Sequence, residues 1–527
     1  MINGFASFPF FEDFFNEHNI SITLNKTNLR KVCYCEKKQR ITDEKYILNV
    51  EQSDGVVNVT VECSGKKSAF YALCDLKLRV ENNALADGEF TCSPTFATRG
   101  YIEGFYGTPW THEKRRSVMS IMALNRMNTV YYAPKDDAYH RDLWRELYPE
   151  ADLIKLKELV DLAKANYMEF HFCIAPGLSM KYSSEDEFST LMKKTEQLYS
   201  IGIRSFGLLL DDIDEELFYE EDKALYGETV NAHIALVEKY YNALLDVDKT
   251  VKLTVCPTLY NGIGNEYYIS KLGKNISPQI SLFWTGRDIC SRELTSREAR
   301  DFIDGTNHKP LYWDNYPVND MSMFNEMHIS PIINRDPDLW KYSEGIIANC
   351  MEYAECSKIP LITFADYLWD SENYNPERSW ENAIRQVVGE DAETFIVFAD
   401  HLYTSCLKDE PSRRMKKHFA GVLDLLKKGE IEKAVVLAEE YIAKMNDASE
   451  YLKKDLPICN ELTKWSEKFF VACEMFEKLM EVLKNKTDKN TNELYAIIDK
   501  YDSMPAKLTE EMNIRLFLGS MFGIFEV

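Results

Sequence analysis

The sequence predicts an α/β protein with a closed, TIM-like (β/α)8 barrel, preceded by a small α+β domain and followed by an all-α helical domain. Three observations support this fold class. Short apolar stretches alternate with polar turns early in the chain, strand-like runs alternate with helical stretches in its middle, and long charged helical segments follow. A chain of 527 residues is long enough for two or three domains. The expected domain bounds are 1–95, 96–376 and 377–527.

The first domain is expected to combine a small sheet with one helix. Residues 46–50 and 56–63 have the pattern of strands, and residues 68–76 have the pattern of a helix. Residues 1–19 are rich in Phe, but they have no basic segment and no small-residue cleavage site, so they do not resemble a secretion signal. The sequence therefore favours a cytoplasmic protein, or a secreted one if a signal was removed before the numbering begins.

The barrel is predicted from eight strand-like runs with helical patterns between them. Two of the helices begin with capping boxes, Ser184 with Glu187 and Thr295 with Glu298. Eight units favour closure over an open doubly wound sheet, and no G-x-G-x-x-G follows a strand to indicate dinucleotide binding. The expected strands are residues 98–102, 129–133, 169–175, 205–211, 252–257, 279–284, 309–314 and 344–351.

The last part of the chain has the pattern of packed helices. Ile431, Val435, Ala438, Ile442 and Met445 are spaced by four and three residues, which places them on one face of a helix. A helix with such an apolar stripe buries it against neighbouring helices in a bundle. We therefore expect a helical domain after the barrel.

Composition excludes several classes of partner and site. The 85 acidic residues outnumber the 62 basic ones, and the resulting charge of −23 disfavours binding to nucleic acid or to anionic membranes. The 13 cysteines include no C-x-x-C pair, so neither a disulfide framework nor a zinc site is indicated. No apolar run is long enough to span a bilayer. The sequence indicates no cofactor, and it does not indicate an oligomeric state.

The most informative motif is an aspartate doublet after the fourth expected strand. Asp211 and Asp212 follow an apolar run directly, and two carboxylates at the end of a buried strand must be solvated, paired or protonated. Carboxylates that crowd one pocket can acquire different pKa values, so one can act as a general acid. The doublet alone is equally compatible with a helix cap or a structural cation site that includes Asp214.

Glycine, aromatic and polar residues also lie at the ends of the other expected strands. In a parallel barrel these strand ends meet at one face, where functional residues collect. Glycine permits close approach of a ligand, aromatic rings supply stacking surfaces, and polar side chains bind hydroxyl groups. Each residue taken singly also has a structural interpretation, such as a turn glycine or a Trp that fills the barrel. These strand ends are residues 103–107, 133–137, 175–177, 256–260, 284–286, 313–315 with Asp320 beyond them, and Asn349.

Four motifs together resemble a known enzyme family. The run R-G-Y-I-E-G-F-Y-G-T-P-W at residues 99–110, L-D-D at 210–212, W-T-G at 284–286 and W-D-N at 313–315 are similar to those of glycoside hydrolase family 84. This family contains the O-GlcNAcases and hyaluronidase-like β-N-acetylglucosaminidases. The resemblance covers the whole barrel and extends more loosely to S-A-F-Y-A-L at residues 68–73 and to the helical region.

The resemblance implies substrate-assisted hydrolysis of terminal β-linked N-acetylglucosamine, with an oxazoline intermediate and retention of configuration. Asp211 would bind and orient the acetamido N–H, and Asp212 would serve as the general acid and base. Tyr260 would donate to the oxazoline oxygen, and Asn315 would support the acid pair and the acetamide. Gly104, Lys135, Asp320 and Asn349 would hold the sugar hydroxyls, and Cys256, Trp284 and Trp313 would form the walls of the acetamido pocket.

The expected substrate is a GlcNAc-bearing glycoprotein, glycopeptide or oligosaccharide. Two other functions remain open at this point. A catalytically silent sugar-binding scaffold would keep the pocket but would not need an acid pair. A metal-dependent hydrolase could use the carboxylates as ligands, although none of the nine histidines has H-E-x-x-H spacing. Asp137 and Asp214 are expected to be solvated loop acids.

Overall fold

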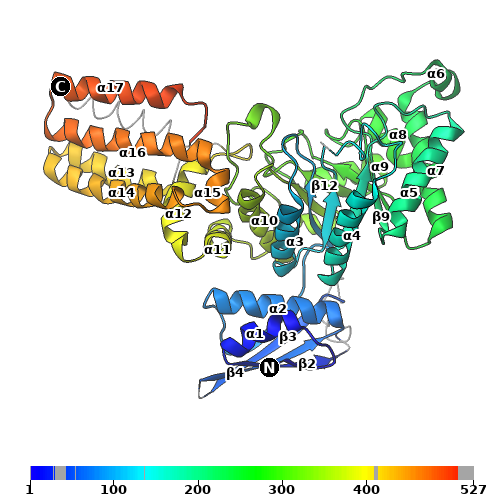
Figure 1. Ribbon diagram of the computed structural model, residues 1–527, viewed down its shortest axis with the longest axis horizontal. Helices are drawn as coiled ribbons and strands as arrows, with labels where there is room; N and C mark the ends of the chain where they lie inside the picture. The colour runs from blue at the N-terminus through cyan, green and yellow to red at the C-terminus, as the bar shows by residue number, and fades with distance from the viewer. Residues whose placement is uncertain are drawn as a thin grey trace.

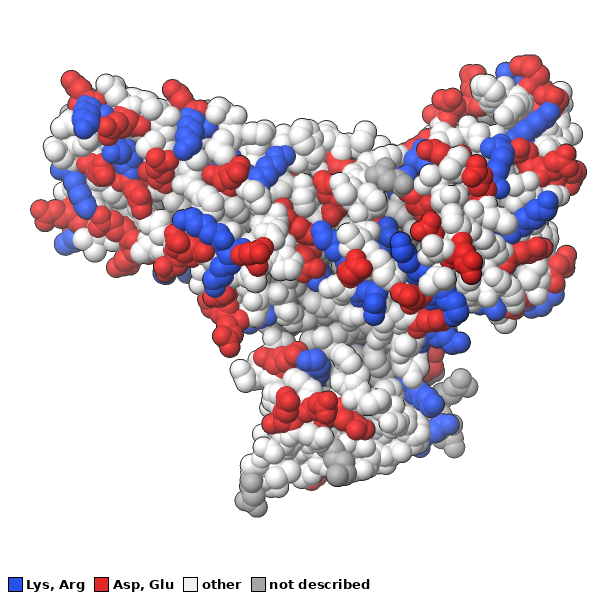
Figure 2. All heavy atoms as spheres, viewed as in Figure 1, with Lys and Arg blue, Asp and Glu red and all other residues white. Residues whose placement is uncertain are grey.

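The computed structural model describes residues 2–27, 29, 43–53, 55–135, 137–408 and 413–508. Figure 1 shows three parts: a barrel in the centre, a small sheet with its helices on one side of it, and a group of long helices on another. Acidic and basic side chains are interspersed over the face of all three parts that Figure 2 shows. No helix in the described ranges is long and apolar enough to cross a membrane.

The N-terminal part is a five-stranded mixed sheet covered by two helices. Strands β1, β2 and β4 are parallel to one another, whereas β3 lies antiparallel to β4 and β5. The sequence pattern predicted β3, β4 and α2 but not the helix α1, which buries Phe11 and Phe15. The elements are β1 Ile2–Gly4, α1 Pro9–Glu17, β2 Ile20–Lys26, β3 Tyr46–Ser53, β4 Val56–Cys63, α2 Lys66–Glu81 and β5 Gly88–Cys92.

The central part is a closed barrel of eight parallel strands, as predicted. Each strand pairs with its neighbours along the chain, and β13 pairs with β6 to close the barrel. All eight strands begin and end within two residues of their predicted bounds. The strands are β6 Thr98–Glu103, β7 Thr129–Tyr132, β8 Glu169–Ile174, β9 Ser205–Leu209, β10 Lys252–Cys256, β11 Ser281–Trp284, β12 Pro310–Asp314 and β13 Gly345–Asn349.

Helices surround the barrel, and two of them begin where the sequence indicates. The predicted caps form, because Ser184 Oγ accepts a hydrogen bond from Glu187 N and Thr295 Oγ1 accepts one from Glu298 N. The helices are α3 His112–Leu124, α4 Glu150–Ala165, α5 Glu185–Ser200, α6 Glu220–Tyr226, α7 Thr229–Val247, α8 Tyr267–Asn275, α9 Ser296–Thr306 and α10 Ala354–Trp369.

The seventh crossover departs from the predicted alternation of strand and helix. Residues 315–344, all of which are described, contain no α-helix, only the 3-10 turns Met321–Met323 and Leu339–Lys341. Three prolines at positions 317, 331 and 337 interrupt this segment, and proline cannot donate the backbone hydrogen bond that a helix interior requires. The crossover is therefore a long loop over the end of the barrel.

The C-terminal part consists of helices in the described residues, as predicted. Val435, Ala438, Ile442 and Met445 of the predicted stripe are buried in α14, whereas Ile431 is only partly buried. Helix α14 contacts α13 and α16. The helices are α11 Pro376–Val388, α12 Ala392–Ala399, α13 Arg413–Lys427, α14 Ile431–Leu452, α15 Pro457–Glu461, α16 Thr463–Lys484 and α17 Asp488–Ser503.

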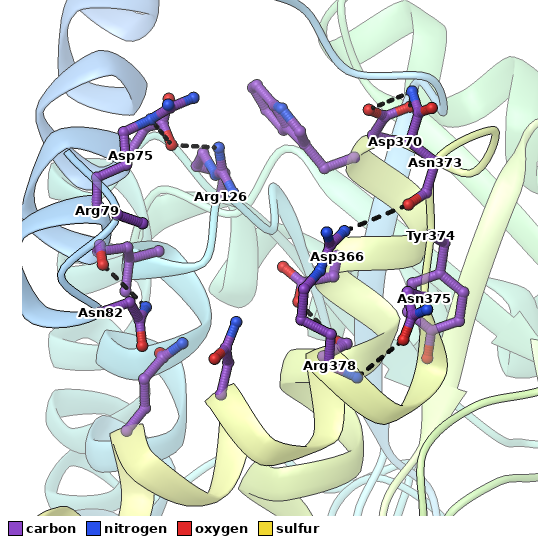
Figure 3. A pocket seen from close by; sticks show the side chains of 16 residues that line it. Asp75, Arg79, Asn82, Arg126, Asp366, Asp370, Asn373, Tyr374, Asn375 and Arg378 are labelled. Carbon is purple, nitrogen blue, oxygen red and sulfur yellow. Dashed lines mark hydrogen bonds and ion pairs between the residues drawn. The ribbon is translucent and has the colours of Figure 1, made fainter. Parts of the chain in front are cut away.

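A buried arginine joins the N-terminal sheet to the barrel. Arg126, just before β7, donates to Tyr46 Oη at 3.2 Å and lies 3.4 Å from Asp75 of α2. Its guanidinium also stacks on Trp369 of α10, 4.4 Å from the ring centroid. Figure 3 shows the cavity of about 430 Å³ beside these residues, between α2 on one side and α10 and α11 on the other. This joint lies at the strand N-termini, away from the face where barrel sites form.

Candidate active site

A cavity of about 1040 Å³ opens at the C-terminal ends of the barrel strands. Ten of the eleven residues predicted to form a site line this cavity. Trp284 is the exception. The ten residues are Gly104, Lys135, Asp211, Asp212, Cys256, Tyr260, Trp313, Asn315, Asp320 and Asn349.

The two aspartates of the doublet share one cation. Lys135 Nζ donates to Asp211 Oδ2 at 2.9 Å and lies 3.5 Å from Asp212 Oδ2. Neighbouring residues of an extended chain normally point to opposite sides. Asp212, however, has a left-handed backbone with φ of 53°, a conformation that aspartate tolerates better than most residues. This turn brings both carboxylates to the same cavity.

Asp211 is the buried member of the pair and is held in its charged form. Burial by itself would raise its pKa, but the Lys135 ammonium and its hydrogen bond outweigh this effect, so the pKa lies below its ordinary value. The same contact raises the pKa of Lys135, although burial opposes it. Asp211 Oδ1 is buried and accepts no hydrogen bond from another described residue. Within the described part of the chain, this oxygen is thus an acceptor that a ligand could use.

Asp212 has a different environment, because its side chain is 32% exposed and is held by two tyrosines. Tyr106 Oη donates to Asp212 Oδ2 at 2.6 Å, and Tyr260 Oη donates to Oδ1 at 3.2 Å. Burial raises the pKa of Tyr260, and the charge of Asp212 adds to this effect, so the phenol remains a donor at neutral pH. Asp212 therefore reaches the open part of the cavity while remaining fixed in place.

Two residues of this network were not predicted. Tyr106 lies within the E-G-F-Y-G run but was not assigned to the site. Arg141, from the segment after β7, donates to Tyr106 Oη at 3.1 Å and to the backbone oxygen of Asp212 at 3.3 Å. The position of Tyr106 in the recognised motif was a signal for its role. The contact of Arg141 depends on the fold and had no such signal.

The opposite wall is organised around Asn315. Its Oδ1 accepts hydrogen bonds from Trp313 Nε1 at 2.9 Å and from Asn349 Nδ2 at 3.0 Å. Its Nδ2 donates to the backbone oxygen of Ile289 at 2.8 Å. Gly104 packs on Trp313 so closely that a Cβ at this position would lie 2.6 Å from the indole ring. The ends of β6, β12 and β13 and the loop after β11 thereby fix the orientation of the Asn315 side-chain amide.

Two further predicted residues complete the lining. Asp320, from the loop after β12, accepts a hydrogen bond from Tyr106 N at 2.8 Å, and burial raises its pKa. Cys256 is buried at the end of β10, and burial raises the pKa of its thiol well above the ordinary value. It presents a small, uncharged surface to the cavity.

Trp284 does not form a wall of this cavity, which corrects the expectation from the sequence. The preceding residue, Phe283, packs inside the barrel against Trp313, with ring centroids 5.2 Å apart. Successive side chains of a strand point to opposite faces, so Trp284 faces outward. There it packs against Phe302 of α9 with ring centroids 4.9 Å apart. Its environment is that of a core residue.

Of the two residues expected to be solvated loop acids, the structure agrees for Asp214 but not for Asp137. Asp214 is exposed, as expected of a solvated loop acid. Asp137 is instead partly buried and accepts hydrogen bonds from Tyr132 Oη at 2.9 Å and Tyr148 Oη at 2.6 Å. It therefore anchors the segment after β7. Among the described residues, no group of three or more His, Cys, Asp or Glu side chains is placed to hold a metal ion.

Comparison with known families gives one match that covers most of the barrel and part of the helical region. Residues 99–400 match the sequence model of the family described as β-N-acetylglucosaminidase. Protein O-GlcNAcase of Rattus norvegicus and that of Mus musculus are each 30% identical to this chain over 285 residues. These alignments cover 53% of this chain but only 30% of each relative.

Solved structures resemble a larger part of the chain. A mutant of the O-GlcNAc hydrolase of Thermobaculum terrenum superposes with a TM-score of 0.76 at 32% identity, and the match covers 82% of this chain and 94% of that one. The structure of CpGH84B superposes with a TM-score of 0.79 at 26% identity, and that match covers 96% and 90% of the two chains. The similarity therefore includes parts on both sides of the barrel.

Proposed function

The chain belongs to the β-N-acetylglucosaminidase family, glycoside hydrolase family 84, and on this premise we propose that it is a retaining exo-β-N-acetylglucosaminidase. One observation carries the proposal. Two adjacent carboxylates face one cavity in different environments, Asp211 buried against an ammonium and Asp212 open to the cavity between two phenols. Such a division suits one acid that remains ionised and one that transfers protons.

Asp211 is proposed to bind the acetamido group of a terminal N-acetylglucosamine. Its buried oxygen without a protein donor is an acceptor for the substrate N–H, and its negative charge makes the acetamido oxygen more nucleophilic. That oxygen attacks the anomeric carbon and forms an oxazoline ring, on which positive charge develops. Lys135 keeps Asp211 ionised, so its charge is available throughout the step.

Asp212 is proposed to act as general acid and then as general base. In the first step its proton passes to the glycosidic oxygen as the bond to the anomeric carbon breaks, and the aglycone leaves. In the second step its carboxylate takes a proton from water, which attacks the anomeric carbon and opens the oxazoline. Two displacements at one carbon give overall retention of configuration. Tyr106 holds the carboxylate in position for both transfers.

The other lining residues are proposed to orient the sugar. Tyr260 would turn its hydrogen bond to the acetamido oxygen and hold that oxygen in line with the anomeric carbon as the oxazoline ring forms. Asn315 is oriented by Trp313 and Asn349, so its amide offers a fixed contact to the acetamide. Gly104, Lys135, Asp320 and Asn349 are proposed to bind hydroxyl groups, and Cys256 and Trp313 to enclose the acetyl methyl group.

The decisive experiment compares aryl β-N-acetylglucosaminides with good and poor leaving groups. The Asp212→Asn variant should lose far more activity on the poor leaving group, because only that substrate needs a proton donor. Asp214→Asn is a matched control, since Asp214 is exposed on the same loop. Equal losses on both substrates would exclude Asp212 as the general acid. Binding of N-acetylglucosamine without any turnover by the wild type would indicate a sugar-binding scaffold instead.

Substrate assistance has its own test. Fluorine atoms on the acetyl group withdraw electrons from the acetamido oxygen, so kcat/KM should fall steadily from the mono- to the trifluoroacetyl substrate. A rate that does not depend on fluorine would rule out the oxazoline route. The natural substrate is proposed to be a GlcNAc-bearing protein, glycopeptide or oligosaccharide, and parallel assays with O-GlcNAc peptide, chitobiose and hyaluronan fragments would distinguish these classes.

A further inference from the structure

Two cysteines from distant parts of the chain meet at the edge of the cavity. Cys290 lies on the loop after β11 and lines the cavity, whereas Cys406 lies after α12. Their side chains are hydrogen-bonded to each other. Both thiols are free and only partly buried. The barrel and the helical region are thus in contact through a pair of thiols beside the proposed active site.

Each cysteine is held on a structured segment. Next to Cys290, Ser291 Oγ donates to the backbone oxygen of Asp288 at 3.0 Å, and Arg335 Nη2 donates to the backbone oxygen of Ser291 at 3.3 Å. Cys406 lies in a tight turn closed by reciprocal backbone hydrogen bonds between Ser405 and Lys408, at 3.2 and 3.1 Å. The two thiols are therefore positioned by their backbones and do not meet by chance rotation of long side chains.

The cysteine pair is connected to Asn315 from both sides. The Cys406 thiol lies 3.9 Å from the backbone oxygen of Asn315. The Asn315 side chain donates to the backbone oxygen of Ile289, the residue before Cys290, at 2.8 Å. A change in the distance between the two sulfur atoms would therefore displace the segments that orient the Asn315 amide.

The two thiols differ in reactivity. The hydrogen bond from Cys406 lowers the pKa of Cys290, although burial and nearby aspartates, Asp320 among them, act against it. The same hydrogen bond and burial raise the pKa of Cys406. Cys256 also lines the cavity, but burial raises the pKa of its thiol well above the ordinary value. Of the two cysteines in the cavity wall, Cys290 is thus a better nucleophile than Cys256.

We propose that Cys290 and Cys406 form a reversible disulfide with a low-molecular-weight disulfide as oxidant, and that the cross-link lowers the activity of the adjacent site. The Cys290 thiolate attacks one sulfur of the small disulfide and releases one thiolate. The Cys406 thiolate then attacks the Cys290 sulfur and releases the second. Two protein thiols become one disulfide, and the small disulfide becomes two thiols, so atoms and electrons balance.

The effect on catalysis rests on the proposed function and follows from geometry. Sulfur atoms in hydrogen-bond contact must approach to about 2 Å to form the bond. This movement draws together the segments on either side of Asn315. Displacement of a positioning group by about 1 Å can reduce a rate by up to about a hundredfold, so we expect a loss of kcat/KM of roughly tenfold or more.

The test uses the full chain treated with oxidised glutathione. Peptide mapping by mass spectrometry should find the 290–406 cross-link in the wild type, with a fall in kcat/KM that dithiothreitol reverses. Cys406→Ser should stop at a mixed disulfide on Cys290, and Cys290→Ser should give neither product. Cys92→Ser, at a partly buried free thiol in the N-terminal sheet, should behave like the wild type.

The outcomes separate this inference from the proposed function. Absence of the 290–406 cross-link in the oxidised wild type overturns the inference, because mass spectrometry detects it without any activity. A cross-linked protein with unchanged kcat/KM overturns the regulatory effect. If the reduced protein does not hydrolyse aryl β-N-acetylglucosaminides, the proposed function fails while the cross-link is still measured.

Discussion

Replacement of Lys135 by methionine gives the sharpest test of the charge arrangement. The side chains of Lys135 and Asp211 are 6% and 7% exposed, and their charged atoms are 2.9 Å apart. Methionine keeps the unbranched shape of the side chain but removes the charge and the hydrogen bond. The variant therefore leaves a buried aspartate beside Asp212 without its cation, while the cavity keeps nearly the same size.

The size of the effect follows from the distance and the burial. At an effective dielectric constant of about 20, two charges 2.9 Å apart attract by about 6 kcal/mol. Removal of one partner from a buried pair usually costs about 3–5 kcal/mol, because the remaining charge is uncompensated. About 1.4 kcal/mol corresponds to a tenfold change in rate, so a loss of even half this stabilisation lowers kcat/KM roughly tenfold to a hundredfold.

The direction in which kcat/KM and stability change with pH in this variant also follows from the structure. Lys135 lowers the pKa of Asp211, so it contributes stability above the ordinary aspartate pKa of 3.8 that is lost as pH falls through the lowered value. In Lys135→Met burial, the largest influence, still raises this pKa, and only the smaller lowering by a backbone hydrogen bond and by Arg141 opposes it. The acidic limb of the kcat/KM profile should therefore move to higher pH, and the loss of stability should be larger at neutral than at acid pH.

The assay is kcat/KM for an aryl β-N-acetylglucosaminide between acid and mildly alkaline pH, together with urea unfolding. Lys157→Met is the matched control, because it removes the lysine of an exposed ion pair with Asp161 on α4, where both side chains are more than half exposed. This control should change neither measurement appreciably. An unchanged acidic limb in Lys135→Met would refute the view that this lysine keeps Asp211 ionised.

Four further substitutions test separate parts of the barrel. Tyr260→Phe should lower kcat by about tenfold to a hundredfold, because the acetamido oxygen loses the donor that aligns it for attack on the anomeric carbon; an effect confined to KM would contradict this role. Trp284→Ala should destabilise the fold by about 3–5 kcal/mol in urea unfolding yet leave KM unchanged, whereas Trp313→Ala should raise KM. Arg335→Met breaks a buried pair with Asp314 and should cost about 3–5 kcal/mol in the same unfolding assay; a stable variant would show that this pair contributes little.

The barrel could be predicted because its strands are short apolar runs separated by capped helices. These signals are local, so the predicted bounds of all eight strands agree with the observed bounds to within two residues. The helix α1 was not predicted, although Phe11 and Phe15 are four residues apart, as on one face of a helix. The seventh crossover was misjudged because the alternation of the other seven units was extended over a segment with three prolines, which disfavour a helix.

Residues of the site could be predicted where a strand end or a recognised motif marked them. The prediction for Trp284 was wrong because successive side chains of a strand point to opposite faces. The W-T-G motif does not show which of its residues faces the cavity. Arg141 and Cys406 could not be found, because each acts through contacts with residues far away in the sequence. The charge of Asp211 likewise depends on Lys135, which follows a strand two positions earlier in the barrel.

The aspartate doublet shows the limit of sequence reasoning most clearly. Leu209 packs inside the barrel, and Leu210 packs in the core outside it. Continued alternation would point Asp211 to the cavity and Asp212 away from it, so a doublet on a regular strand could not form an acid pair. The left-handed backbone at Asp212 breaks the alternation at a cost of about 1–2 kcal/mol. Hydrogen bonds from Tyr106 and Tyr260 to the carboxylate stabilise this conformation, and they do so only when the side chain faces the cavity. The tyrosines therefore help to create the pair as well as to orient it.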